Sequence, residues 1–170
     1  SKRERAERSF RTALSLAPED AKALMGLADV QLAGGDVQAA VSGLQRAVAL
    51  QPGDGAAHLK LGLARWRQGE RSSAEEGPAL AEAERSMLAA VELVPTNDEA
   101  YYNLGLLHKE QGRMERAREY FEKALHLNPD EEEYFEQLEL SGDDDTDLEV
   151  GDEELADQEL EDEEEEEEEE

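Results

Sequence analysis

The stretch Asp98-Glu-Ala-Tyr-Tyr-Asn-Leu-Gly-Leu-Leu-His-Lys-Glu-Gln-Gly-Arg-Met-Glu-Arg-Ala-Arg-Glu-Tyr-Phe-Glu-Lys-Ala-Leu-His-Leu-Asn-Pro-Asp-Glu131 decides the fold of this chain. It is 34 residues long and closes on Pro129, and other prolines repeat that length. Pro18 and Pro52 are 34 residues apart, as are Pro95 and Pro129, and the middle interval of 43 residues is 34 plus nine. Self-similarity at a fixed period of this size is typical of repeat proteins.

Small and large residues recur at fixed distances before each proline. An alanine stands twelve residues back and again five residues back, and a large apolar residue stands eight back. In the first half of a unit, a leucine precedes an alanine or glycine, and another glycine follows seven residues later. These columns are Ala6, Ala40, Ala83 and Ala117; Phe10, Leu44, Met87 and Phe121; Ala13, Ala47, Ala90 and Ala124; Leu27, Leu61 and Leu104; Ala28, Gly62 and Gly105; and Gly35, Gly69 and Gly112. We interpret the small residues as points of close helix approach, the large residues as the packing between pairs, and the last glycine as the end of the first helix.

The pattern resembles the tetratricopeptide repeat, a 34-residue unit with a Leu-Gly pair, aromatic residues, two alanines and a closing proline. The quoted stretch is the best copy, although His108 replaces an aromatic residue there, and Leu24 and His58 replace the first large residue of other copies. The resemblance implies an all-α fold. It implies a right-handed superhelical solenoid of antiparallel helix pairs, followed by a capping helix and a disordered acidic tail.

The repeat register divides the chain into six parts. The expected parts are 1–20, the second helix of a truncated repeat; 21–54, a repeat; 55–97, a repeat with the nine extra residues near 70–80; 98–131, a repeat; 132–140, a capping helix; and 141–170, a disordered acidic tail.

Charge is distributed unevenly along the chain. Of 45 acidic residues, 26 lie from Asp130 onward, where no Lys or Arg occurs. The part before Asp130 therefore holds 19 acidic residues against 17 basic ones, a net charge of −2. In 141–170 like charges repel and apolar residues are too few to offset the entropy of ordering, which predicts disorder. The overall charge of −28 argues against direct binding of nucleic acid.

The residue types that carry chemistry are sparse. Cysteine is absent, which excludes disulfides, thiol catalysis and cysteine-based zinc sites. His58, His108 and His126 are scattered without metal-ligand spacing, and neither a nucleophile motif nor a phosphate-binding loop occurs. We predict that the chain is not an enzyme and uses no cofactor or metal. No apolar run approaches the roughly 20 residues that span a bilayer, so we expect no membrane contact and a cytoplasmic location, or a nuclear one in a eukaryote.

The resemblance also implies a ligand site, because stacked helix pairs form a concave surface lined by their first helices. Met25, Leu59, Leu63, Tyr102 and Leu106 form an apolar strip there, flanked by charges of both signs. The candidate groove residues are Lys22, Met25, Asp29, Leu59, Lys60, Leu63, Trp66, Arg67, Tyr102, Asn103, Leu106 and Lys109. An alternative is that some of these side chains pack against the neighbouring pair, and that Trp66 covers Gly69 and the inserted loop.

One subclass of the family holds the C-terminal carboxylate of chaperone peptides with a set of Lys, Asn and Arg side chains. At the corresponding positions this chain has Met25, Asp29, Lys60, Glu99 and Asn103. That clamp is missing, so we do not predict binding of chaperone tails. The strip suits an extended peptide or an amphipathic helix.

Three functions remain open at this point. The first is a non-catalytic scaffold that binds a protein or peptide in the concave groove. The second is a chaperone or sequestering factor for a basic protein of histone or ribosomal type, in which the acidic tail masks Lys and Arg clusters. The third is a regulatory or targeting region of a larger protein whose function lies upstream of Ser1.

Overall fold

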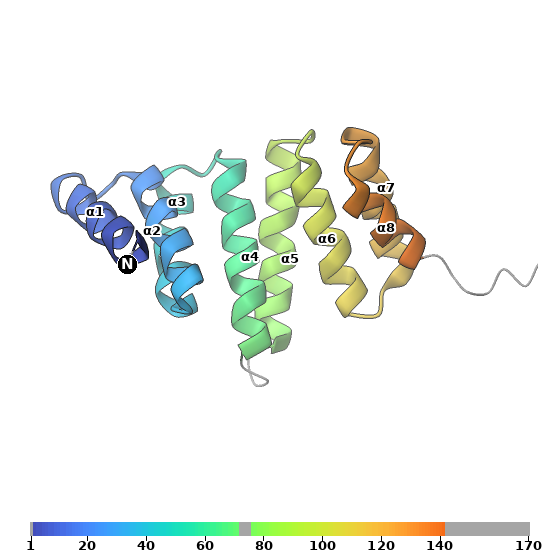
Figure 1. Cartoon of the computed structure of the whole chain (residues 1–170), viewed down its shortest axis with the longest axis horizontal. Helices are drawn as coiled ribbons and strands as arrows, with labels where there is room; N and C mark the ends of the chain where they lie inside the picture. The colour runs from blue at the N-terminus through green and yellow to red at the C-terminus, as the bar shows by residue number, and fades with distance from the viewer. Residues whose placement is uncertain (1, 72–75, 142–170) are drawn as a thin grey trace, which may run out of the picture.

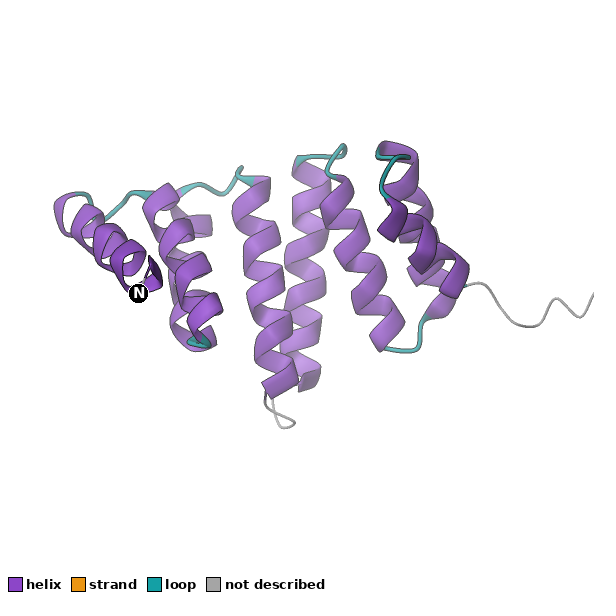
Figure 2. Ribbon diagram, viewed as in Figure 1, coloured by secondary structure: helices purple, strands orange, loops and turns teal. Residues whose placement is uncertain are grey.

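The computed structural model describes residues 2–71 and 76–141, and every regular element within these ranges is an α-helix. The helices are α1 (Lys2–Leu16), α2 (Ala21–Gly34), α3 (Val37–Leu50), α4 (Gly55–Arg71), α5 (Glu76–Leu93), α6 (Asp98–Glu110), α7 (Met114–Leu127) and α8 (Glu132–Leu140). They follow one another along the long axis of the molecule and short loops join them (Figures 1 and 2). The predicted all-α solenoid is confirmed.

Three helix pairs form the body of the solenoid. Helix α2 packs on α3, α4 on α5 and α6 on α7, and consecutive pairs pack on one another. Helix α1 lies against α2, and α8 lies against α7. In the repeat register α1 therefore has the position of a second helix, and α8 has the position of a first helix.

The predicted tail, 141–170, falls outside the described residues except for its first residue. Ser141 is buried, and its hydroxyl donates to the backbone carbonyls of Gln137 and Leu138. Since the last carbonyls of a helix lack partners inside the helix, Ser141 closes α8 rather than starting the tail.

Helix ends follow local chemistry. The side chains of Asp20, Asp36 and Asn97 each accept the backbone N–H three residues later, as N-cap residues do. Gly35 and Gly112 have φ values of 83° and 71°, a left-handed conformation that glycine adopts without strain. These two glycines end or follow the first helices of their pairs, as the sequence predicts.

The third glycine of that column does not end a helix. Gly69 lies inside α4, which continues to Arg71, and α5 begins at Glu76. These two helices have 17 and 18 residues, whereas α2, α3 and α7 have 14 each and α6 has 13. Extra residues of this repeat therefore lengthen both helices of the pair, and the prediction that Gly69 ends the first helix is wrong.

The core consists of the predicted columns. In the three complete pairs, the two alanine columns and the large column are fully buried, at 0% exposure for every member from Ala40 to Ala124. Small residues on the first helices admit the large ones: a Cβ added at Gly62 would lie 2.6 Å from Met87, and one at Gly105 would lie 2.4 Å from the Phe121 ring. Close packing at these contacts determines how the first helices are spaced, and hence the shape of the candidate site.

Candidate functional site: the concave face

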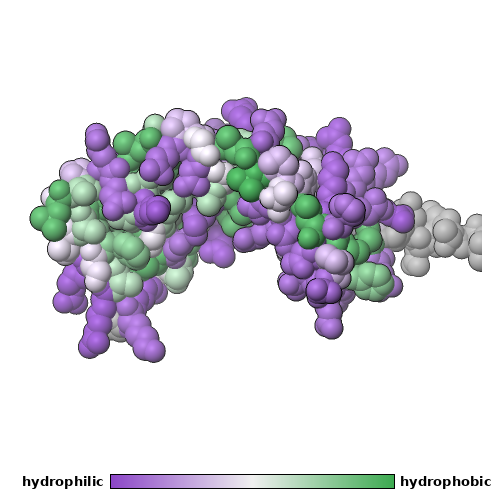
Figure 3. All heavy atoms as spheres, turned by 90° about the horizontal axis from the view of Figure 1, so that it is seen from above, coloured by the Kyte–Doolittle hydropathy of each residue, from purple (hydrophilic) through white to green (hydrophobic). Residues whose placement is uncertain are grey.

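The molecule is hollowed on one side (Figure 3). This side faces the viewer in Figure 1, where α2, α4 and α6 succeed one another. We call the surface of these three helices the concave face. It carries all twelve candidate groove residues, because each lies on α2, α4 or α6.

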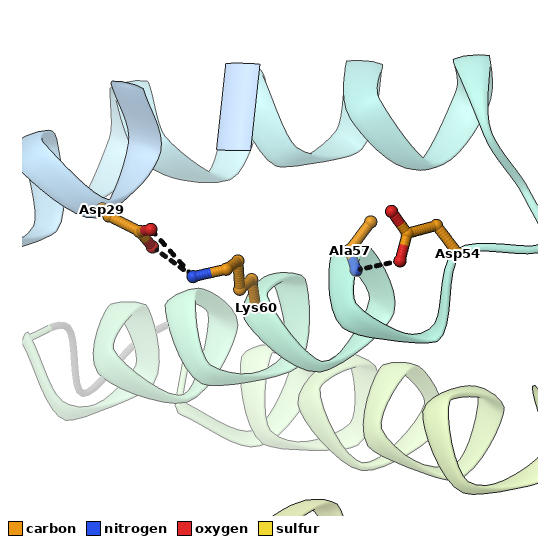
Figure 4. Close-up of polar contacts among 4 residues, drawn as sticks. All are labelled: Asp29, Asp54, Ala57 and Lys60. Carbon is orange, nitrogen blue, oxygen red and sulfur yellow. Dashed lines mark hydrogen bonds and ion pairs between the residues drawn. The ribbon is translucent and has the colours of Figure 1, made fainter. Parts of the chain in front are cut away.

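Polar candidate residues on the concave face contact one another. Lys60 of α4 donates to both carboxylate oxygens of Asp29 of α2, at 2.7 and 2.8 Å (Figure 4). The indole N–H of Trp66 donates to Glu110 at 2.7 Å and joins α4 to α6. Lys109 of α6 donates to Gln137 of α8 at 2.8 Å. Each contact links one repeat to the next, so these side chains stabilise the stack as well as lining the surface.

The apolar candidates fall into two groups. Met25, Leu63, Trp66 and Leu106 are half-buried and pack at the edge of the core. Leu59 is only 5% exposed and packs in the core between α4, α5 and α6. The half-buried group keeps surface that a ligand can reach, whereas Leu59 contributes to packing.

Tyr102 is also a packing residue, at 9% exposure. Its ring stacks on Tyr134 of α8 with 4.7 Å between centroids and lies tilted against Phe121 of α7 at 5.8 Å. Its hydroxyl donates to Glu133 at 2.6 Å. Burial and this carboxylate both raise the pKa of Tyr102 above its ordinary range, so the hydroxyl keeps its proton. Tyr102 therefore holds the capping helix in place.

Three candidates remain for the ends of the surface. Lys22 and Arg67 are exposed, and within the described part of the chain neither forms an ion pair. The amide of Asn103 donates to the backbone carbonyl of Glu99. The concave face thus presents unpaired positive charge on α2 and α4 beside half-exposed apolar side chains.

These links between repeats escaped the sequence analysis. Asp29 and Lys60 are 31 residues apart, and so are Tyr102 and Glu133. That separation is one repeat less three residues. Since residues three apart share a helix face, this offset between a donor and an acceptor is the signal that could have found the contacts.

The buried histidine is a separate feature, behind the concave face. His108 is fully buried, and its ring stacks on Tyr120 with 5.2 Å between centroids. Its Nε2 lies 3.4 Å from Glu84 without hydrogen-bond geometry, and Arg113 approaches Nδ1 at 3.5 Å. Burial lowers the pKa of His108, with Arg113 acting in the same direction and Glu84 opposing it. The neutral ring fills the position of the expected aromatic residue.

We expect acidification to destabilise the fold through His108. The unfolded chain binds a proton near the ordinary histidine pKa of about 6.5, whereas the folded chain resists it. The contribution of His108 to stability is therefore complete above that pH and is lost as the pH falls toward the lowered folded pKa. Urea unfolding of the wild type and of His108→Phe, measured at about pH 7.5 and about pH 5.5 on either side of that pKa, tests this.

The control is His126→Phe, since His126 is exposed. We expect the free energy of unfolding of this control to fall on acidification as the wild type does, and that of His108→Phe to fall less. Equal losses in all three proteins would contradict the role of His108.

No group of three or more His, Cys, Asp or Glu side chains placed to hold a metal ion occurs in residues 2–71 and 76–141. None of the described helices is both long enough and apolar enough to cross a membrane.

Comparisons with known proteins locate the chain among helical repeats. The family model described as the cytochrome c-type biogenesis protein H TPR domain matches residues 5–135. No curated protein matches the chain. Among solved structures, a thermophilic TPR protein of Thermus thermophilus is similar with a TM-score of 0.73 and 24% identity, over 82% of this chain and 72% of that one.

Two further structures share the fold. MamA from Desulfovibrio magneticus RS-1 has a TM-score of 0.69 and 24% identity, covering 82% of this chain and 73% of its own. The first TPR of Spaghetti (RPAP3), bound to an HSP90 peptide, has a TM-score of 0.63 and 20% identity, covering 71% of this chain and 89% of its own. At these identities the likeness concerns the fold.

Proposed function

Because this chain belongs to the family of the cytochrome c-type biogenesis protein H TPR domain, we propose that it is a non-catalytic scaffold whose concave face binds a segment of another protein. The segment is an extended peptide or an amphipathic helix. Repeat folds of this kind generally bind proteins or peptides, and the extended surface comes from stacking one helix pair on the next.

One observation carries the proposal. The half-exposed side chains of Met25, Leu63, Trp66 and Leu106 occur on all three first helices, so that they follow the concave face from α2 to α6. A row of apolar contacts beside a polar rim is the usual anatomy of a peptide or helix groove. Trp66 adds a large amphipathic ring of the type enriched at binding hot spots.

The charges indicate the chemistry of the ligand. Asp29 is already paired with Lys60, and Trp66 already donates to Glu110. Among the candidate groove residues, Lys22 and Arg67 are the exposed cations that keep their full donor capacity. A ligand with spaced apolar residues and at least one carboxylate therefore fits the surface best, since a guanidinium pairs with a carboxylate in bidentate geometry.

Selection from a display library of short random peptides tests the proposal. We expect selected peptides to be rich in apolar residues with a carboxylate, and to change the fluorescence of Trp66, the single tryptophan of the chain. Arg67→Glu should weaken their binding at least about tenfold, or about 1.4 kcal/mol. Arg85→Glu is the matched control, because Arg85 is equally an exposed helix arginine but lies on the second helix α5.

The outcome that contradicts the proposal is equal weakening by both substitutions, or selected peptides that leave Trp66 unchanged. Either result would place binding away from the concave face. Both substitutions alter exposed side chains, so a difference between them does not arise from misfolding.

The charge distribution favours a second candidate function, binding of a basic protein by the acidic end. From Asp130 onward the chain has 26 acidic residues and no Lys or Arg, and those on α8 lie mostly on its exposed surface. A lysine-rich peptide that binds in low salt and is released in high salt, with no effect of Arg67→Glu, would favour this function over the groove.

A further inference from the structure

The two ends of the solenoid are complementary halves of a repeat. Helix α1 has the register of a second helix, and no first helix lies beside it in the described part of the chain. Helix α8 has the register of a first helix, and no second helix covers it there. Each end therefore presents the face that its missing partner would cover.

Helix α1 is incompletely covered. Ala6, Phe10 and Ala13 belong to columns that are fully buried in every complete pair, yet these three residues are only half-buried. Beside them on α1 lies a hollow of about 540 Å³, lined by Arg5, Arg8, Ser9 and Thr12. A helix face with apolar residues and a hollow is suited to receiving a side chain from another helix.

Helix α8 has two different faces. Tyr134 is buried, and Gln137 accepts the hydrogen bond from Lys109, so this side packs toward α6 and α7. The other side is exposed, and Phe135 at its centre is 51% exposed. Its members, spaced three and four residues apart, are Glu132, Phe135, Glu136 and Glu139. A phenylalanine among carboxylates is thus left to solvent.

The pair α6 and α7 shows how such faces fit. Tyr101 of α6 stacks on Tyr120 of α7, with 6.4 Å between ring centroids. Phe135 occupies the Tyr101 position of α8, 34 residues later, and Ser9 occupies the Tyr120 position of α1. Because serine is much smaller than tyrosine, α1 has a hollow at the place where an aromatic ring of a first helix would lie.

The charges of the two ends are opposite. Helix α1 carries five Lys and Arg against two Glu, whereas residues 130–140 carry six carboxylates and no cation. Opposite charges on facing helices favour their association and disfavour the pairing of two like ends. One departure loosens the fit: Glu139 stands where α6 has Gly105, so α8 cannot approach a second helix as closely as α6 approaches α7.

We propose that copies of this chain associate head to tail, with α8 of one copy lying on α1 of the next and Phe135 entering the hollow between Arg5 and Arg8. The two half repeats then form one composite repeat, and the concave faces of the copies stay open. A contact between different surfaces leaves a free end on each copy, so it generates open chains rather than a closed dimer unless the rotation closes a ring.

Sedimentation equilibrium of the full chain tests the proposal. Because each copy has a net charge of −28, the measurement needs about 0.15 M salt, where a Debye length of about 8 Å screens long-range repulsion but preserves contacts. We expect the average mass to keep rising with concentration beyond that of a dimer. Phe135→Ala should raise the concentration needed at least about tenfold. Leu93→Ala is the matched control, since Leu93 is similarly exposed, at 42%, but lies on α5.

A charge exchange makes the test specific. Arg5→Glu with Arg8→Glu, and separately Glu136→Lys with Glu139→Lys, should each abolish association. Mixing the two variants should restore it, because every contact in the mixture again joins opposite charges. A simple loss of folding in either variant would not be reversed by mixing.

Three outcomes would overturn the proposal. The first is a wild-type chain that stays monomeric at every concentration. The second is association that Phe135→Ala leaves unchanged, which would indicate that the acidic residues 142–170, rather than α8, bind α1. The third is a mass that stops at a dimer, which would indicate a symmetric contact elsewhere.

Discussion

Phe121→Ala is expected to lower the free energy of unfolding by about 3–5 kcal/mol, as for other buried aromatic residues cut back to Ala. The Phe121 ring is fully buried between Gly105 of α6 and Tyr102, whose ring centroid lies 5.8 Å away. Removing the ring leaves a cavity at the joint of three helices, and neighbouring helices cannot collapse into it without breaking the repeat spacing. Urea unfolding followed by far-ultraviolet circular dichroism measures the loss.

The control for this substitution is Phe135→Ala, which removes the same ring from an exposed site on α8. We expect its effect on the unfolding of the monomer to stay within about 0.5 kcal/mol, the usual range for surface substitutions. A double-mutant cycle of Gly105→Ala with Phe121→Ala adds a direct test, because a Cβ at Gly105 clashes only while the ring is present. Additive effects of the two substitutions would contradict this account of the core.

The second large effect is expected for Tyr102→Ala, which should also lower the free energy of unfolding by about 3–5 kcal/mol. The Tyr102 ring contacts Tyr134 of α8 and Phe121 of α7, and its hydroxyl donates to Glu133. Helix α8 has nine residues, too few for an isolated helix to be stable in water. We therefore expect hydrogen exchange protection to disappear first from α8, before α2 and α3 lose theirs.

Tyr102→Phe separates the two contributions of this side chain. It keeps the ring contacts and removes only the hydrogen bond to Glu133, so we expect a loss of about 0.5–1.5 kcal/mol. Protection of α8 should survive in this variant. If α8 remained protected in Tyr102→Ala as well, Tyr102 would not be the residue that holds the cap, and its position on the concave face would need another explanation.

These effects bear on the proposed function because the cap and the concave face share a helix. Tyr102 and Lys109 lie on α6, and both hydrogen-bond to α8. Leu106 of the same helix packs in the same cluster and keeps surface for a ligand. Loosening α8 should therefore weaken ligand binding at α6 more than at α2, since repeats contact mainly their neighbours.

The repeat architecture follows from the sequence alone. Four prolines, the alanine columns and the large column predict the pairing of helices, because each column packs in the same way in every repeat. Phe121, Leu44 and Met87 are indeed fully buried. The capping position of α8 and the absence of strands in the described residues follow from the same register.

The tertiary structure decided which concave side chains are available. Asp29 and Lys60 belong to different repeats, as do Tyr102 and Glu133, and only the spacing of consecutive helices brings them together. Gly69 stays inside α4 because the extra residues of its repeat extend both helices, which no column of the repeat encodes. Column positions are set by packing within one repeat, and the sequence determines them; exposure depends on the angle and distance at which the next repeat packs, and only the assembled solenoid determines it.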